Sequence, residues 1–305
     1  EDAHGNNTAV GYRSLKTLNA GAEGYNTAVG TSAGTALTTG RENVFIGDTA
    51  GDALTAASHN VAVGRTALTA DTTGSRSTAV GYATLAQQNF STATNSENTA
   101  VGYGAGNAIT TGQYNTFIGS ASGDAVTDSD ENVAVGYNSL STNTLGNRNV
   151  AVGTGALATM NQTTATDSNN TAVGQAAGYA LTTGINNVFI GMAAGDAQTT
   201  ANQNVAIGKD SMTTNVAGAK NVAVGAGTLA NFNVTAADTY NTAVGDHAGS
   251  SVTTATASTL IGGLAGDALT TGGANTLVGY AAGGALVEGT GNIAVGYQAL
   301  DADVG

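Results

Sequence analysis

The stretch Asn26–Gly30, which reads Asn-Thr-Ala-Val-Gly, decides the fold because the chain repeats it from end to end. The pattern returns 17 residues later at Asn43–Gly47 as Asn-Val-Phe-Ile-Gly, and after 17 more at Asn60–Gly64 as Asn-Val-Ala-Val-Gly. It occurs 17 times in 305 residues, and 12 of the 16 spacings between closing glycines are 17. Such a period is too short for a helical-pair repeat. A β-branched centre bounded by Asn and Gly is typical of a strand of four to five residues between turns.

A second period groups the motifs in fours. The four spacings that are not 17 are 19, 21, 21 and 20, and they fall at every fourth step. Four residues after the closing glycine the chain carries two glycines and then two large apolar residues, as in Gly34, Gly51, Leu68 and Leu85. We therefore predict an all-β fold, a parallel β-solenoid (β-roll) of about 17 coils with a 17-residue repeat and a 72-residue superperiod. It would form a single domain over 1–305, with superrepeats at about 30–101, 102–173, 174–244 and 245–305.

The fourth motif position is the most uniform apart from the glycine beside it. It holds Val or Ile in every copy, so we predict that this row points into the coil and packs on itself. The third position, mostly Ala, would then face outward against a partner chain. The predicted core row is Val10, Val29, Ile46, Val63, Val80, Val101, Ile118, Val135, Val152, Val173, Ile190, Ile207, Val224, Val244, Ile261, Val278 and Val295.

The first and last motif positions have backbone roles. Asn leads 15 copies and Ser leads two, Ser77 and Ser258. Stacked Asn side chains at one register can hydrogen-bond along a ladder, so we expect one here. The invariant glycine predicts a positive φ or an approach that leaves no room for a Cβ atom.

Composition excludes several classes of protein. The chain has no Cys, which excludes disulfide scaffolds and thiolate metal sites. Eight Lys and Arg against 21 Asp and Glu give a net charge of −13, so nucleic acid is not an expected partner. No apolar run approaches the roughly 20 residues of a membrane span, and we expect no membrane insertion.

No motif indicates catalysis. Gly30–Gly34 matches the Gly-x-Ser-x-Gly nucleophile elbow, but it is one copy of the repeat and lacks the strand-turn-helix setting of that motif. His4, His59 and His247 occupy unrelated registers, so they can form no metal cluster and are expected at the surface. We expect no enzymatic activity, no cofactor and no resident metal.

Three periodic polar or aromatic features remain. Asp52, Asp124, Asp196 and Asp267 recur once per superrepeat, which favours turn hydrogen bonds; the alternative is a calcium site in which Asp128, Asp130 and Glu131 join Asp124. Tyr follows the closing glycine six times, where it either packs on neighbouring coils or contacts a sugar. The long loops carry three Asn-x-Ser/Thr sequons, which are turn residues or candidate glycan-attachment sites: Asn89, Asn161 and Asn233.

The motifs resemble a known group of repeats. Asn26–Gly30 and Asn292–Leu300, which reads Asn-Ile-Ala-Val-Gly-Tyr-Gln-Ala-Leu, are similar to the repeats of trimeric autotransporter adhesin heads and of phage tail fibres. The resemblance covers the whole chain. It implies a left-handed parallel β-roll, three of which pack into a homotrimer that is extracellular or virion-borne and binds a surface. The adhesin coil is shorter and lacks the Thr-Thr-Gly turn found here at Thr38–Gly40.

We therefore expect a non-enzymatic fibre segment of an extracellular or virion surface appendage, located outside the cell, at its surface or on a virion. Its partners would be its own copies and a cell-surface glycan or protein receptor. The alternative is a self-assembling extracellular filament, in which the last coil of one copy stacks on the first coil of the next. Around the motifs that begin at Asn7 and close at Gly296, neither end shows a helix, a charged cap or Pro, so we expect either that the fibre continues beyond these ends or that copies stack end to end. An ice-binding solenoid is disfavoured, because the second motif position mixes Thr with Val.

Overall fold

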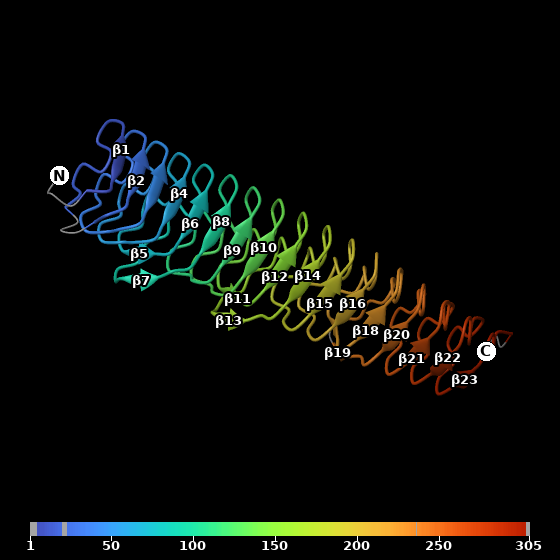
Figure 1. Cartoon of the computed structure of the whole chain (residues 1–305). Coiled ribbons are helices and arrows are strands. Elements are labelled where there is room, and N and C mark those ends of the chain that lie inside the picture. The colour runs from blue at the N-terminus through green and yellow to red at the C-terminus, as the bar shows by residue number, and fades with distance from the viewer. Residues whose placement is uncertain (1–4, 20–22, 236, 303–305) are drawn as a thin grey trace. The chain divides into compact units, whose positions relative to one another are not determined.

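The computed structural model describes residues 5–19, 23–235 and 237–302. Within these ranges it is an all-β parallel solenoid of about 17 turns with no α-helix, which confirms the predicted fold class (Figure 1). Each motif forms one strand, and that strand has three residues rather than four or five, because the flanking Asn and Gly turn the chain. These strands are β1 (Thr8–Val10), β2 (Thr27–Val29), β3 (Val44–Ile46), β4 (Val61–Val63), β6 (Thr78–Val80), β8 (Thr99–Val101), β9 (Thr116–Ile118), β10 (Val133–Val135), β12 (Val150–Val152), β14 (Thr171–Val173), β15 (Val188–Ile190), β16 (Val205–Ile207), β18 (Val222–Val224), β20 (Thr242–Val244), β21 (Thr259–Ile261), β22 (Thr276–Val278) and β23 (Ile293–Val295).

The chain divides into two compact units, residues 1–149 with 161–166 and residues 150–160 with 167–305. In the first unit the motif strands from β1 to β10 stack in parallel, and in the second the motif strands from β12 to β23 do the same. The register matches motif position to motif position, so that Thr27, Ala28 and Val29 lie opposite Val44, Phe45 and Ile46. Each motif position therefore forms a row of side chains that runs from coil to coil.

The long coils add short strands. In the first unit β5 (Gly74–Ser75) pairs with β7 (Thr94–Asn95), and in the second β17 (Gly218–Ala219) pairs with β19 (Ala237–Asp238). The corresponding segments between them are β11 (Gly146–Asn147) and β13 (Thr166–Asp167). The extra residues that set the superperiod thus extend a loop at one corner of the coil and leave the motif strands in register.

The core lies on the opposite side of the strand from the one predicted. From the second coil on, the third motif position is buried: Ala28 and Phe117 are both 0% exposed, whereas the following Val29 and Ile118 are 36% and 40% exposed. None of the 17 Val or Ile residues from Val10 to Val295 is buried, so the predicted core row and the outward Ala row were both wrong. Because side chains alternate along a strand, one wrong assignment reverses both rows.

A physical reason for this orientation is that two positions match in side-chain size. Where the third motif position holds a large residue, the residue four after the closing glycine is itself glycine. A Cβ atom added to Gly34 would lie 2.7 Å from the Phe45 ring, and one added to Gly51 would lie 2.5 Å from it. One inward Phe therefore fills the space left by two glycines, whereas the coils with Leu68 and Leu85 carry Ala inside. The same packing recurs at Phe117 with Gly106 and Gly123, and at Phe189 with Gly178 and Gly195; in the last superrepeat Leu260 and Leu277 replace Phe.

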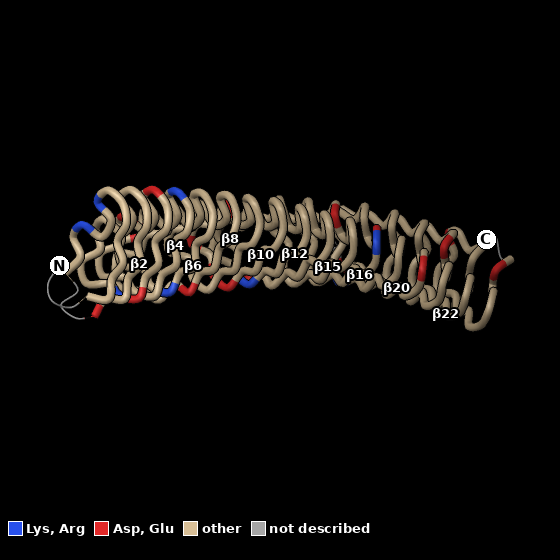
Figure 2. The backbone as a smooth tube through the Cα atoms, turned by 45° about the horizontal axis from the view of Figure 1, so that its top comes forward, with Lys and Arg blue, Asp and Glu red and all other residues tan. Residues whose placement is uncertain are grey.

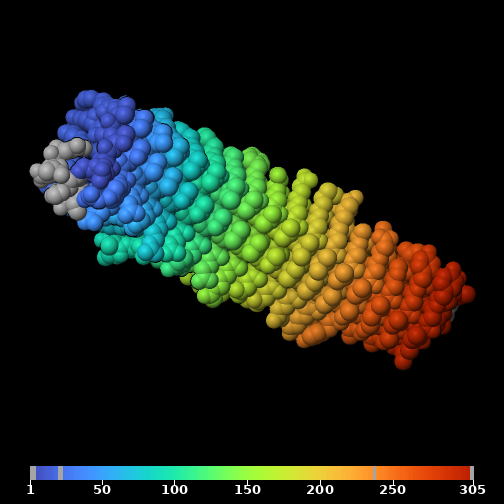
Figure 3. Space-filling view, viewed as in Figure 1, coloured from blue at the N-terminus to red at the C-terminus, as the bar shows by residue number. Residues whose placement is uncertain are grey.

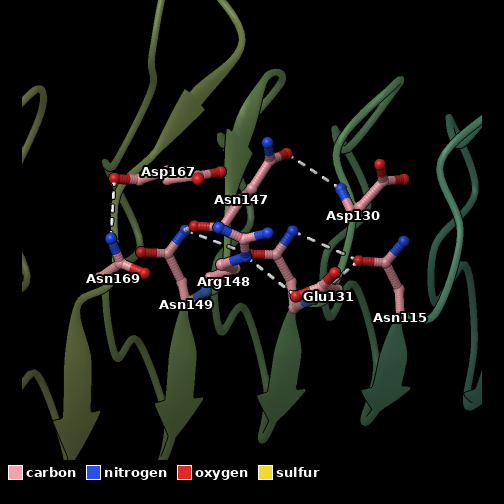
Figure 4. A network of polar contacts seen from close by, with 9 residues as sticks. Asn115, Asp130, Glu131, Asn147, Arg148, Asn149, Asp167 and Asn169 are labelled. Atoms are coloured by element: carbon pink, nitrogen blue, oxygen red, sulfur yellow. Dashed lines mark hydrogen bonds and ion pairs between the residues drawn. The ribbon is translucent and has the colours of Figure 1, made fainter.

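The predicted roles of the motif ends are confirmed. Gly30 has φ of +140°, and a Cβ atom there would lie 2.4 Å from the carbonyl oxygen of Gly47. The buried Asn43 donates through its backbone N–H and through Nδ2 to Asn26 Oδ1, both at 3.0 Å, and Nδ2 also donates to Ala57 O at 3.0 Å. Figure 4 shows a stretch of the same ladder between Asn115 and Asn149. The side chains of one row thus satisfy backbone groups that the turns leave unpaired.

Candidate functional site: the outward strand face

Each motif strand directs its first and third residues outward. In β9 these are Thr116 and Ile118, and in β14 they are Thr171 and Val173. Because the strands are parallel and in register, each unit presents two straight rows of Thr, Val and Ile that have the same spacing as the coils. Figure 3 shows the successive coils of the first unit, from blue to green, as parallel ridges. The result is a regular β-branched face on the solvent-exposed side of the sheet.

The residue before the leading Asn forms one edge of this face. It adopts a positive φ throughout the described coils and holds charged or polar side chains in much of the first unit. Charged and polar side chains at this position contact each other in successive coils. Glu42 lies 3.3 Å from His59, and ion pairs join Arg76 with Glu97 at 3.0 Å and Glu131 with Arg148 at 2.9 Å, the last of which is drawn in Figure 4. In the second unit Lys220 and Asp238 also form an ion pair beside this edge.

The residue after the closing glycine forms the opposite edge. In the first unit Asp48 pairs with Arg65 at 3.4 Å, and the Arg65 guanidinium lies 5.9 Å from the centroid of the Tyr82 ring. Tyr82 then stacks on Tyr103, with ring centroids 5.2 Å apart and ring planes 14° apart. Four consecutive coils are thus linked through their side chains at this edge. Packing of Tyr on neighbouring coils, one of the two predicted alternatives, is observed here.

An apolar centre with polar edges is the arrangement found in protein–protein interfaces. The 17 motif strands contain no charged residue, and Figure 2 places the Lys, Arg, Asp and Glu of the first unit on the turns beyond the strand ends. Exposed apolar surface of this extent marks interaction sites in soluble proteins. The face is therefore the strongest candidate for a functional surface in each unit.

Sequence reasoning missed this face although a signal for it was present. The second motif position is Thr in nine of the 17 copies, and it lies two residues before the Val or Ile. Residues two apart in a strand share a face. A row that accepts Thr so often is more compatible with solvent than with a packed interior. A uniform Val/Ile row suits an exposed sheet face as well as a core, so its uniformity does not indicate burial.

The sequon asparagines lie at the surface. Asn89, Asn161 and Asn233 are all exposed. Asn89 Oδ1 accepts a hydrogen bond from Thr72 at 3.0 Å, and Asn161 Oδ1 accepts one from Thr144 at 2.7 Å. These contacts join successive coils, and both the turn role and glycan attachment stay predictions.

The periodic aspartates differ from one another. Asp52 accepts a hydrogen bond from Thr69 and Asp196 accepts one from Thr213, both at 2.6 Å, so these carboxylates link neighbouring coils rather than the two ends of one turn. Asp124 Oδ1 is shielded from water and has no hydrogen-bond partner. Burial raises the pKa of the Asp124 carboxyl group.

The alternative calcium site does not assemble. Asp128 accepts a hydrogen bond from Thr111, Asp130 accepts one from the backbone N–H of Gln113 at 2.7 Å, and Glu131 pairs with Arg148. Among the residues that the structure describes, no three His, Asp or Glu side chains gather as metal ligands.

The described histidines pair with acidic neighbours at the surface. His59 lies 3.3 Å from Glu42 and His247 lies 2.9 Å from Asp246. His4 lies outside the described residues.

No family model, no curated protein and no solved structure matches the chain. In residues 5–19, 23–235 and 237–302 the structure has no helix that could cross a membrane.

Proposed function

We propose that this chain is a structural segment of an extracellular or virion surface appendage, and that it assembles with its own copies into a homotrimer that attaches to a cell surface. The role is architectural rather than catalytic. The observation that carries the proposal is the outward face of paired Thr/Val and Val/Ile rows, bordered by the ion-pair and tyrosine edges.

The copies would meet through the outer β-branched rows and not through the Ala row that the sequence predicts. The Ala row is inside the coil, so it is not available to a partner, whereas the β-branched rows are. An apolar face that continues along each unit can bury area steadily as copies align along it. Val, Ile and Thr also lose little side-chain freedom in such packing, because their χ1 angle is already restricted.

The mass of the chain in solution tests this assembly. Sedimentation equilibrium over a range of concentrations should give three times the chain mass. The variant Val101→Glu with Ile118→Lys places opposite charges on adjacent strands β8 and β9, where they can pair with each other in the single chain. We expect it to fold, as judged by circular dichroism, and to sediment as a monomer.

A matched control carries the same charges elsewhere. Thr72→Lys with Asn89→Glu alters an exposed, hydrogen-bonded pair in successive coils away from the strand face and should leave the trimer intact. A wild-type chain that stays monomeric at high concentration would overturn the proposal. A mass that grows without limit would support the alternative, a filament built by end-to-end stacking.

A further inference from the structure

The tyrosine edge of the first unit ends at an uncovered ring. Asp48, Arg65, Tyr82 and Tyr103 contact one another in successive coils, and the next residue at this register is Ser120. The Ser120 side chain is too short to cover the face of Tyr103 that points away from Tyr82. Tyr103 is accordingly 64% exposed, against 43% for Tyr82.

A cleft of about 360 Å³ opens beside this ring. It runs across three coils and is lined by Tyr82, Tyr103, Ala83, Gly104, Asn107 and Asp124, among others. Within a coil, the small residue directly follows the tyrosine, as Gly104 follows Tyr103, and the polar side chain comes three residues later, as at Asn107. The cleft therefore offers an aromatic surface, a floor of small residues and hydrogen-bonding groups within one coil corner.

Gly104 keeps the cleft open and is not needed for the backbone. Its φ of +63° is close to the +53° of Ala83 and the +51° of Ala121, which occupy the same register in the coils on either side. A Cβ atom added to Gly104 would meet nothing within 4 Å. The missing side chain therefore leaves free space above the floor of the cleft, where neighbouring coils have Ala.

The polar side of the cleft has capacity for a further hydrogen-bond donor. Asn107 donates to Ala83 O at 2.9 Å and accepts from Gln87 at 3.3 Å, so its amide is held in place. Asp124 Oδ1 has no partner, whereas the equivalent Asp52 and Asp196 each accept a threonine hydroxyl. Asp124 lines the cleft, so its carboxylate can accept a hydrogen bond from a ligand there.

The second unit has a cleft at the same coil corner with different chemistry. It measures about 440 Å³ and is lined by Lys209, Asp210, Asn231 and His247, with no aromatic residue other than His247. The Tyr280–Tyr297 stack, with centroids 5.6 Å apart, is the other stacked tyrosine pair in the described residues. Of these two clefts, only the first combines a tyrosine ring, an open floor and polar groups.

We propose that the cleft at Tyr103 binds a neutral pyranose unit of a cell-surface glycan. The apolar C–H face of the sugar stacks on the free face of Tyr103, and the negative face of the aromatic ring attracts those hydrogens. The sugar hydroxyls donate to Asp124 and exchange hydrogen bonds with Asn107. The Asp124 carboxylate disfavours an anionic sugar at the same place. This inference deepens the proposed function, on which it rests, by assigning a ligand class to the attachment role.

Saturation-transfer NMR on the whole chain tests the site, with methyl β-galactopyranoside and methyl β-glucopyranoside as neutral probes and N-acetylneuraminic acid as the anionic one. We expect transfer to the ring C–H protons of at least one neutral probe and none to the anionic sugar. Tyr103→Ala should weaken binding by roughly tenfold, which corresponds to about 1.4 kcal/mol. Ser120→Tyr should do the same by covering the ring, and Tyr already occupies this register in other coils. Tyr280→Ala, which removes a tyrosine from the other stack, should leave binding unchanged.

Two results would overturn the site. One is the absence of transfer to either neutral probe at millimolar concentration, and the other is transfer that Ser120→Tyr and Tyr103→Ala leave unaltered. Because the probes are single sugars, a monomeric chain can still bind them. A trimer without sugar binding would remove this inference alone, and sugar binding by a monomer would remove the proposed assembly alone.

Discussion

Two neighbouring rows of the same strands have opposite environments. In β9 Phe117 is completely buried and Ile118, the next residue, is 40% exposed. The inner row varies among Ala, Phe and Leu, while the outer row is always Val or Ile. Variation is possible inside because a larger residue there is balanced by glycines at another corner of the same core. In this solenoid the row with the same residue type in every coil is therefore not the buried one. The buried row is the one in which a change of side-chain size is balanced by a change at another position of the core.

The largest expected effect comes from placing a charge in each row in turn. Ala134→Asp buries a carboxylate with no partner and should destabilise the fold by several kcal/mol. Val135→Asp, one residue later in β10, puts the carboxylate at the outer surface and should cost about 1 kcal/mol or less in the dissociated chain. Thermal unfolding at low protein concentration measures both. Equal losses would mean that the two rows do not differ as described.

Compensation inside the core can be tested by exchange. Phe117→Ala should destabilise the fold by about 3–5 kcal/mol, because it empties the space between Gly106 and Gly123. Adding Gly123→Leu copies the coils that carry Ala inside and Leu four residues after the glycine, such as the coil with Leu140, whose φ is +51°. The double variant should therefore recover part of the loss.

A double-mutant cycle in denaturant gives the coupling between the two positions. Additive losses would contradict the packing explanation of the superperiod.

Adjacent inner and outer polar positions should also differ. Asn132 lies in the buried ladder, where its Oδ1 accepts from the backbone N–H of Asn149 at 3.0 Å and from Asn149 Nδ2 at 3.1 Å. Asn132→Ala leaves these donors unpaired and should cost about 1–3 kcal/mol. Glu131→Ala removes the exposed ion pair with Arg148 and should cost less than about 1 kcal/mol. Chemical denaturation of the two single variants makes the comparison, and a larger loss for Glu131→Ala would contradict it.

The smallest expected effect concerns pH. Burial raises the pKa of Asp124 above the ordinary value of 3.8. Between the two values the folded chain holds a proton that the unfolded chain has lost, so this group adds stability at low pH and loses it as pH rises through the folded-state pKa. Asp124→Asn should remove that contribution and flatten the melting temperature in the mildly acidic range. An unchanged pH profile would show that Asp124 does not titrate in this way.

Much of the fold followed from the sequence, because the repeat constrains it many times over. Strand positions, parallel register, the Asn ladder and the glycines of positive φ each depend on local chemistry that recurs at one spacing. The sequence did not show which side of the strand points into the core, because Val and Ile suit both a core and an exposed sheet face. That orientation depends on where Phe45 and its two glycines meet, and those residues come from different corners of successive coils.

The candidate site was predictable only in part. The Tyr residues form a row in the sequence, and that pattern predicts either packing on neighbouring coils or contact with a sugar. The cleft at Tyr103 depends on three things that are missing. Gly104 has no side chain, Ser120 has only a short one, and Asp124 Oδ1 has no hydrogen-bond partner. Each of these has meaning only relative to neighbouring coils. A single copy of the motif does not contain that information.

One experiment can test both which side of the strand points inward and whether copies assemble through its outer face. Because the chain has no cysteine of its own, a single introduced thiol reports on one position. Ala172→Cys and Val173→Cys place a thiol at adjacent inner and outer positions of β14, which are 0% and 36% exposed. The rate of thiol labelling should be negligible for Ala172→Cys at every protein concentration. For Val173→Cys it should be fast in dilute solution and should fall as the concentration rises and copies cover the face. Fast labelling at Ala172→Cys with protection at Val173→Cys in dilute solution would reverse the assigned faces. Labelling of Val173→Cys that does not depend on concentration would contradict assembly through this surface.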